Sequence, residues 1–572
     1  MVAFLAFRWR PAEPAALVQA RKALDELTDW RIAVDAPGLV LAVRGPNWPA
    51  VRRLPAGRGW VVGDLHRRDF RPVEADAADH LMVSQSMSAL QVAQRLCEDA
   101  WGRYVALIDP GASSEAVFRD PSGAVDAFTW RAAGLSMVGS HMPEWLPASL
   151  VPPLQFDWPV IARWLVDSSQ AAITSGLLPL RSVTPGAVSA SAGGEVQVWR
   201  PAVFARRATN AATGEALPAL LDACVDAETA GASVVAAEIS GGLDSAILAS
   251  SLARNAGRVG LWMNYHAAEG SGDERAFARD VAGLWGLPLT EMVKTPFVYD
   301  AQKVEETGAG LRPGFHALDA GGDADIAARL AAASADRLVS GQGGDMALFN
   351  LPTGLIVADH LRRAGFAGLG SDYVLQVARW TRQSVWRTLG QAVRPGAAWP
   401  GEALAADHPW MADTRGLPPG KRAHIVMLAQ KLSTHIENRR GRQAEVLTPF
   451  LVQPMLEHCL AIPVPDLTAG GRDRGLARRV FADRLPPSVL NRRDKGELSA
   501  FYARVVADSL PFLRPYLLEG VLAGEGVIDR DTFERRLTIE ALIWQAESAG
   551  IMSAVTVEAW LRCWRRRGAG SV

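Results

Sequence analysis

The sequence predicts an α+β sandwich at the N-terminus, followed by an α/β domain with a doubly wound parallel sheet and a helical C-terminal extension. Residues 1 to about 200 contain short β-type runs bounded by Gly, Pro and Asp. Between residues 234 and 340, strand patterns alternate with helix patterns, which is typical of a parallel sheet. From about residue 375 onward the pattern is mostly helical.

Two domains are predicted from the length of 572 residues and from a change in composition. Residues 201–214 are rich in Ala, Arg, Asn and Thr, and this composition is typical of a linker. We therefore expect one domain over residues 1–205 and a second over residues 206–572.

The first domain is predicted to mix strands with helices. Short β-type runs cover residues 39–43, 104–108 and 195–199. Helical patterns at residues 15–27 and 88–98 lie between them. This mixture favours sheets that pack together with a few helices.

The second domain is predicted to wind around one parallel sheet. Its elements, in order, are strand 234–239, helix 245–255, strand 259–263, helix 273–285, strand 289–293, a helix near 323–335 and strand 337–340. Ligands of such sheets bind beyond the carboxyl ends of the strands. The loops that follow the first and the last of these strands are therefore the expected site.

Bulk composition argues against several classes of function. Apolar residues make up 49% and charged residues 21%, as in soluble globular proteins. The net charge of −1 gives no sign of the excess positive charge that nucleic-acid-binding proteins carry. No apolar run approaches the roughly 20 residues of a membrane span, and the apolar start is too short for a signal peptide. The scattered cysteines predict a reducing cytoplasm without structural zinc; they are Cys97, Cys224, Cys459 and Cys563.

The first expected loop reads Ser-Gly-Gly-Leu-Asp-Ser over residues 240–245. Paired glycines allow a ligand close to the backbone, and the following helix directs its N–H groups and positive end at an anion. Asp244 would repel a bare phosphate but suits a bridging Mg²⁺. The loop lacks the Walker A pattern. The predicted cofactor-binding residues are Ser240, Gly241, Gly242 and Ser245 at the phosphates, together with Asp244, which would act through Mg²⁺.

The second expected loop reads Gly-Gln-Gly-Gly-Asp over residues 341–345. Gly341 and Gly343 are predicted to lie against the nucleotide. Asp244 and Asp345 are predicted to hold Mg²⁺ on opposite sides of a triphosphate, since Mg²⁺ favours few carboxylates together with phosphate oxygens. The alternative for Asp345 is a helix N-cap.

These motifs carry a family resemblance. The first loop resembles the pyrophosphate loop of ATP pyrophosphatases, which split ATP between the α and β phosphates. Together with Asp273-Glu274, the second loop and Glu-Val-Leu-Thr-Pro-Phe-Leu at 445–451, it resembles the asparagine synthetase family. Segments 101–104, 119–123 and 184–186 are similar to landmarks of that family's glutaminase-type (Ntn-like) domain. The resemblance implies ATP and Mg²⁺ as cofactors.

One departure from the family changes the expected reaction. Members that use glutamine need a cysteine directly after the initiator Met, and this chain has Val2 there. We therefore expect no glutamine hydrolysis, and an amine that arrives with the substrate. β-Lactam and carbapenam synthetases and lasso peptide cyclases share this departure. The run Arg-Asp-Lys-Gly at 493–496, followed by a long helical tail, is most similar to lasso cyclases.

The resemblance also implies catalytic residues. Lys495 matches the catalytic lysine of the ring-closing relatives, and only six of the 60 basic residues are lysines; the alternative is a solvated surface lysine. Glu445 matches the glutamate of a tyrosine–glutamate dyad. The tyrosine position is Gln342, which cannot act as a base.

The base and two further roles therefore stay open. Glu445 alone, a water, Tyr502 or the departing AMP could take the proton. Glu445 could instead be a structural carboxylate paired with an arginine at 439, 440 or 442. Met263 is expected near the adenine or, equally, in the core. Asp273 and Glu274 favour the start of a helix over direct catalysis.

The sequence thus predicts an ATP- and Mg²⁺-dependent macrolactam synthetase. It would adenylate an Asp or Glu side chain of a precursor peptide, and the N-terminal amine would then attack and release AMP. A leader-peptide protease and a recognition element are possible partners. The alternatives are a β-lactam-type synthetase acting on a small molecule, an ammonia-dependent asparagine synthetase, and a binding scaffold without catalysis.

Overall fold

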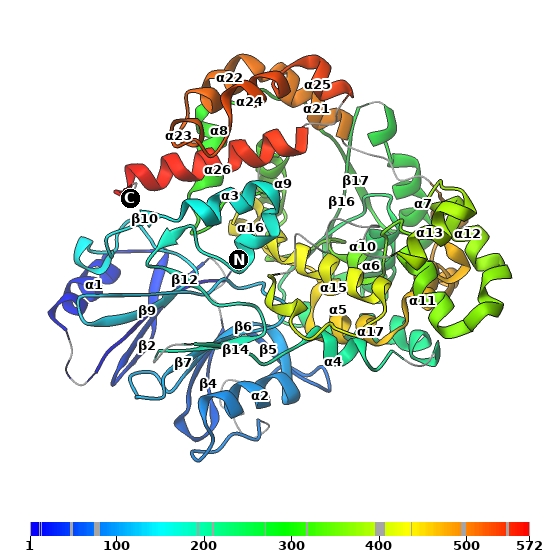
Figure 1. The fold of residues 1–572 in the computed structure, drawn as a ribbon. Helices are drawn as coiled ribbons and strands as arrows, with labels where there is room; N and C mark the ends of the chain where they lie inside the picture. Colours follow the sequence, from blue (N-terminus) through cyan, green and yellow to red (C-terminus); the bar gives the residue numbers. More distant parts are fainter. Residues whose placement is uncertain are drawn as a thin grey trace.

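A computed structural model shows two stacked antiparallel sheets beside a parallel sheet with its helices (Figure 1). It describes residues 2–10, 12, 14–45, 50–73, 81–191, 194–208, 211–268, 270–315, 319–394, 407–435, 437–493, 499–544 and 548–570.

Twelve of the described strands in residues 3–197 form two six-stranded sheets, and β10 (Gln155–Phe156) pairs with β11 (Leu177–Leu178) in a separate small sheet; all these pairs are antiparallel. The first sheet has the order β12 (Arg181–Ser182), β8 (Phe128–Ala132), β9 (Leu135–Gly139), β1 (Ala3–Arg8), β3 (Leu39–Arg44) and β2 (Trp30–Ala36). The second has the order β14 (Glu195–Gln197), β13 (Ala187–Ala190), β7 (Ala116–Arg119), β6 (Ala100–Ile108), β5 (Gly59–Arg67) and β4 (Val51–Arg53).

Side-chain alternation along β1 explains the layers. Phe4 and Ala6 point toward the second sheet, where they meet residues such as Val105. Leu5 and Phe7 point the other way and pack under helix α1 (Ala15–Asp25). The outer face of the second sheet is covered in the same way by α2 (Ala89–Asp99). All six residues of β1 are buried because both faces of its sheet are covered.

The parallel sheet has the order β17 (Leu289–Val293), β16 (Val259–His266), β15 (Val235–Glu238), β18 (Arg337–Val339) and β19 (Glu445–Leu447). All four pairings are parallel, which confirms the predicted parallel sheet. The chain reverses its direction of winding between β15 and β18, and such a switch point is where ligands bind. The sequence did not predict β19, a three-residue strand within a helical region.

Helices cover both faces of this sheet and form the C-terminal region, as predicted from residue 375 onward. Ten of the eleven residues of α6 are buried, among them the polar residues Asp244, Ser245, Ser250 and Ser251. No helix in the described part of the chain is long and apolar enough to cross a bilayer. The main helices are α5 (Leu217–Thr229), α6 (Leu243–Ala253), α7 (Arg275–Trp285), α9 (Ala320–Ala332), α11 (Leu355–Ala364), α12 (Asp372–Trp380), α13 (Val385–Val393), α15 (Pro419–Lys431), α16 (Arg439–Gln443), α17 (Gln453–Ala461), α19 (Gly475–Val480), α21 (Ser499–Asp508), α22 (Leu510–Leu518) and α26 (Ser548–Arg566).

The predicted linker is wrong in its first part. Residues 201–205 form helix α4 (Pro201–Ala205), and Ala202 and Ala205 are buried with residues of α17. Proline suits the first position of a helix, and the small alanine side chains allow close packing. Composition alone did not separate an alanine-rich helix from a linker.

A buried charge cluster joins the antiparallel sheets to the parallel one. The guanidinium of Arg103 on β6 lies 2.6 Å from Asp64, 3.1 Å from Glu228 on α5 and 3.1 Å from Glu445 on β19. Arg337 on β18 also pairs with Glu445. Burial raises the pKa of Glu228 to about 7, although Arg103 opposes this rise.

This raised pKa predicts a pH-dependent stability. Glu228 titrates near 4.5 when unfolded and near 7 when folded, so the folded state holds the proton more tightly. Its contribution is complete below pH 4.5 and is lost as the pH rises through 7, a change of about 3 kcal/mol. Thermal melts of Glu228→Gln and wild type at pH 5 and 7.5 should therefore diverge, with wild type losing more at pH 7.5. Parallel losses in the two proteins would contradict this.

Candidate functional site

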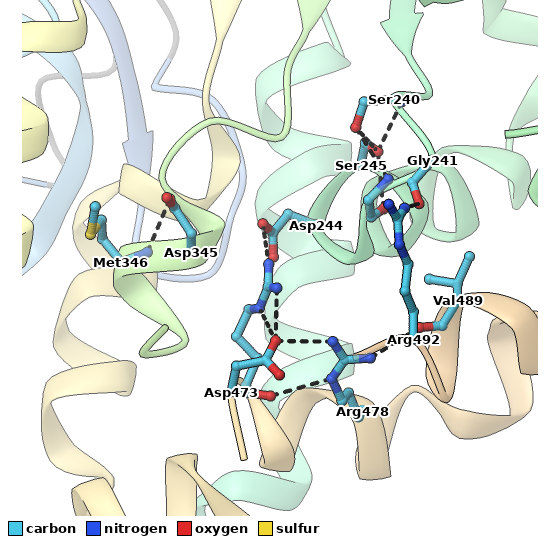
Figure 2. Close-up of polar contacts among 12 residues, drawn as sticks. Ser240, Gly241, Asp244, Ser245, Asp345, Met346, Asp473, Arg478, Val489 and Arg492 are labelled. Carbon is cyan, nitrogen blue, oxygen red and sulfur yellow. Dashed lines mark hydrogen bonds and ion pairs between the residues drawn. The ribbon is translucent and has the colours of Figure 1, made fainter. Parts of the chain in front are cut away.

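The first glycine-rich turn lies at the carboxyl end of β15, directly before α6. The backbone N–H of Ser240 donates to the Ser245 hydroxyl at 3.0 Å, and the two hydroxyls lie 2.9 Å apart (Figure 2). The N–H of Gly242 donates to the Ser240 hydroxyl at 3.3 Å. The predicted residues thus form one closed turn at a helix N-terminus.

Gly241 is required by this turn. Its φ is +85°, which side chains other than glycine rarely adopt. A Cβ atom there would lie 2.7 Å from the carbonyl oxygen of Glu274. The turn therefore presents bare backbone, as a phosphate site needs.

The second glycine-rich turn, after β18, lies against the first. A Cβ atom on Gly341 would lie 2.9 Å from the backbone nitrogen of Ser245, and one on Gly344 would lie 2.7 Å from the side chain of Asp244. Because β15 and β18 are neighbours in the sheet, their carboxyl ends bring the two turns together. Gly343, with a φ of +86°, closes the second turn.

Asp345 follows in the first turn of the short helix α10 (Gly344–Ala347). The N-cap position belongs to Gly343, so the alternative prediction of an Asp345 cap is wrong. The carboxylate accepts the N–H of Met346 at 3.1 Å, and Lys431 lies 3.9 Å away. Asp345 is therefore on the turn that contacts Asp244.

Asp244 is held by an arginine that the sequence reasoning missed. Arg474 donates to the Asp244 carboxylate at 2.7 Å, and only 6% of its side chain is exposed. Arg474 also pairs at 2.8 Å with Asp473, which in turn binds Arg478 at 2.9 Å (Figure 2). Burial would lower the pKa of Arg474, but Asp244, Asp473 and Asp345 raise it. The run Arg-Asp-Arg at 472–474, in which charges alternate, was the feature of the sequence that could have indicated this arginine.

Arg492 is a second cation at the phosphate turn. It donates to the Gly241 carbonyl at 3.2 Å and pairs with Glu274 at 2.5 Å, and its guanidinium stacks 4.0 Å over Phe277. Asp273 pairs with Arg275 at 2.7 Å, so both acids predicted to open a helix are in ion pairs.

Lys495 belongs to residues 494–498, which lie outside the described residues, and its role stays a prediction.

Gln342 and Glu445 line one cavity of about 80 Å³, so the two positions compared with the proton-transfer dyad do lie near each other. Val2 lines the same cavity from the side of the antiparallel sheets. The alternative prediction that Glu445 pairs with an arginine is confirmed, but the predicted partners are wrong, because Arg103 and Arg337 hold its carboxylate. The arginines predicted as partners, at 439, 440 and 442, pair instead with Glu306, Asp323, Glu238 and Glu437.

Glu238 is a further carboxylate at this cavity, and the sequence reasoning missed it. It lies two residues before the phosphate turn and accepts the Ser340 hydroxyl at 2.7 Å. One guanidinium, of Arg440, lies 3.4 Å away. Its place at the end of a strand that leads into a glycine-rich turn was a usable signal.

Two other predicted site residues contact groups other than the two glycine-rich turns: Met263 packs in the apolar core, and Tyr502 is part of a partly buried hydrogen-bond group. Met263 is 2% exposed and packs among Ala236, Met292 and Leu338, in agreement with its core alternative. Tyr502 hydrogen-bonds to Lys294 at 3.0 Å and to Asp319 at 3.1 Å. Burial and Asp319 raise the pKa of Tyr502, which makes it a poor base at neutral pH.

The donor set fits Mg²⁺ bound together with a polyphosphate. Asp244 and Asp345 supply carboxylate oxygens from two turns in contact, and Ser240 and Ser245 supply hydroxyls. Within the described ranges, no group of three or more His, Cys, Asp or Glu could hold a metal ion by itself. A metal here would therefore take further ligands from phosphate oxygens, as Mg²⁺ commonly does.

Comparison with protein families matches residues 216–562 to the asparagine synthase family. The matched region contains all five strands of the parallel sheet, both glycine-rich turns, Arg474 and Glu445. The comparison with curated proteins gives no match.

Proposed function

This chain belongs to the asparagine synthase family, and on that basis we propose that it uses ATP to close a macrolactam ring within a peptide. Membership indicates ATP-dependent amide bond formation in general. The proposal adds that an Asp or Glu side chain of a precursor peptide is the acid, and that the N-terminal amine of the same peptide is the nucleophile.

The contact between the two glycine-rich turns carries the proposal. A carboxylate oxygen of the substrate attacks the α-phosphorus of ATP, and the bond to pyrophosphate breaks. The N–H groups at the start of α6 and the hydroxyls of Ser240 and Ser245 would bind phosphate oxygens. Asp244 and Asp345 would hold Mg²⁺, which supplies charge neutralisation when bound.

In the second step the amine nitrogen attacks the activated carbonyl carbon, the C–N bond forms and AMP leaves. Lys495, by its match to the ring-closing relatives, would stabilise the oxyanion of the tetrahedral intermediate. The proton of the amine passes to a carboxylate at the cavity that Gln342 lines. Glu445 is the base that the resemblance implies, but two guanidiniums hold it, so the geometry favours Glu238.

Residue 2 supports an amine that arrives with the substrate. Val2 is 6% exposed and packs in the apolar layer between the antiparallel sheets. It has no nucleophile, so the cavity that it shares with Gln342 receives no ammonia from glutamine at this position. We expect no glutaminase activity.

ATP–pyrophosphate exchange tests the proposal. The purified protein is incubated with candidate precursor peptides, with small amino acids, and with aspartate plus ammonium. We expect peptide-dependent exchange and a product that has lost one water. Exchange with small acids alone would support a β-lactam-type enzyme. Asparagine formation, or the absence of exchange with every acid, would overturn the proposal.

A matched pair of variants distinguishes the two candidate bases. Glu238→Gln should slow ring closure about 100-fold while leaving exchange within about threefold, because a base acts only in the second step. Glu445→Gln should lower the melting temperature and reduce both steps equally, because Arg103 and Arg337 lose a buried partner. The reverse pattern would identify Glu445 as the base.

A further inference from the structure

A second polar pocket lies far from the glycine-rich turns in the sequence, at the carboxyl end of β1. It measures about 620 Å³, and the hairpin of β8 and β9 forms one wall. Its polar lining residues are Arg8, Arg10, Ser113, Glu115, Arg131, Ser136 and Ser191. None of them belongs to the site described above.

Arg8 is a buried cation with unused hydrogen-bond donors. Its side chain is 3% exposed, and its nearest carboxylate oxygen, on Glu115, lies 3.8 Å away. Among the described residues, neither its Nε nor its Nη1 has a hydrogen-bond partner. A buried charge that lacks hydrogen bonds costs several kcal/mol.

Arg119 in the same pair of sheets shows the contrast. It is fully buried, and each of its three nitrogens donates, to four backbone carbonyls and to Asp126, at 2.7–3.0 Å. Arg119 thus shows that an arginine buried in these sheets can have all its nitrogens hydrogen-bonded. Among the described residues, Arg8 has no hydrogen-bond partner for two of its nitrogens, and it lines a pocket.

The charges around Arg8 do not balance. Burial lowers the pKa of Arg8, and the guanidiniums of Arg131 and Arg10 lower it further, against the effect of Glu115. The Glu115 carboxylate is already used by the Ser191 hydroxyl at 2.5 Å and the Gly111 N–H at 3.2 Å. Among the described residues that line the pocket, three guanidiniums thus face one occupied carboxylate.

We propose that this pocket binds a small molecule that carries a phosphate group. A phosphate at pH 7 has a charge near −2, which matches the excess of two positive charges better than a carboxylate does. Guanidinium forks together with serine hydroxyls suit its oxygens. The pocket is larger than phosphate alone and lies within the usual range of small-molecule sites, so a phosphate ester fits it. The proposal does not depend on the amide-forming reaction.

Thermal melts with added anions test the proposal. Wild type, Arg8→Met and Arg131→Gln are melted without phosphate and with inorganic phosphate, glycerol 3-phosphate or acetate. We expect both phosphates to raise the melting temperature of wild type and acetate to have little effect. Arg8→Met should show no such response.

Titration calorimetry gives the second readout. Arg131 is exposed, and its one hydrogen bond among the described residues goes to the Ser191 carbonyl, so Arg131→Gln should fold normally and weaken phosphate binding about 10-fold. Arg95→Met, on exposed α2, is the control and should bind like wild type. Tighter binding of glycerol 3-phosphate than of inorganic phosphate identifies an ester as the ligand, and the opposite order identifies the free ion. Equal phosphate binding by wild type, Arg8→Met and Arg131→Gln overturns the proposal.

Discussion

Asp244→Asn should reduce ATP–pyrophosphate exchange about 1,000-fold, which corresponds to about 4 kcal/mol of lost stabilisation in the transition state. Asparagine keeps the shape of the side chain and can still accept the hydrogen bond from Arg474. It removes the charge that a divalent cation needs. Exchange measured with saturating ATP, Mg²⁺ and the acid substrate checks this.

Asp273→Asn is the matched control for that variant. Asp273 lies at the same edge of the sheet, but its carboxylate is occupied by Arg275 at 2.8 and 2.7 Å. Exchange should therefore stay within about twofold of wild type, since exposed ion pairs contribute little. Equal losses in the two variants would mean that charge at this edge matters in general, and the assignment of Asp244 would fail.

Arg474→Gly should have opposite effects on metal binding and on exchange. Arg474 occupies the carboxylate that a metal ion would use, so its removal should tighten Mn²⁺ binding without nucleotide about 10-fold. It also removes a buried cation from beside the turn that we propose binds phosphate, so exchange should fall about 100-fold. Glycine suits the φ of +48° at this position, so the backbone is not strained. Electron paramagnetic resonance of Mn²⁺ gives the first readout without any acid substrate.

Two further variants make the result specific. Arg474→Lys restores a cation, so it should bring Mn²⁺ binding back toward the wild-type level. Arg479→Gln removes an exposed arginine that pairs with Glu215, and both readouts should be unchanged. If Arg474→Gly and wild type bound Mn²⁺ equally, Arg474 would not compete for Asp244. In nucleotide-free protein it would then serve only as a structural ion pair.

The charge cluster around Arg103 connects the two halves of the molecule. Arg103 lies on β6 of the antiparallel sheets. Glu445 lies on β19 of the parallel sheet, and Glu228 lies on helix α5. The two halves therefore share buried charges. Removing one partner of a buried ion pair leaves an uncompensated charge at a cost of several kcal/mol. The half that carries Val2 is therefore tied to the parallel sheet electrostatically as well as by apolar packing.

Local patterns in the sequence were sufficient for much of the fold and of the site. The predicted turns at 240–245 and 341–345 lie where β15 leads into α6 and β18 into α10, and the four predicted strands of the parallel sheet overlap β15 to β18. Such features depend on hydrophobic periodicity and on glycine, which act over a few residues. The three-residue β19 was missed because so short a strand gives little periodic signal and lies among helices.

Taken alone, the sequence determined the two glycine-rich turns, the acidic residue that each carries and the valine at position 2, because each depends on neighbouring residues. Only the tertiary structure decided that Arg474 holds Asp244, that Arg103 and Arg337 hold Glu445, and that Glu238 faces the same cavity as Gln342. An ion pair forms where the fold brings opposite charges together. The partners here lie about 100 to 340 residues apart in the chain. Distance along the chain gives no information about such pairs, so the electrostatics of this site could be read only from the folded molecule.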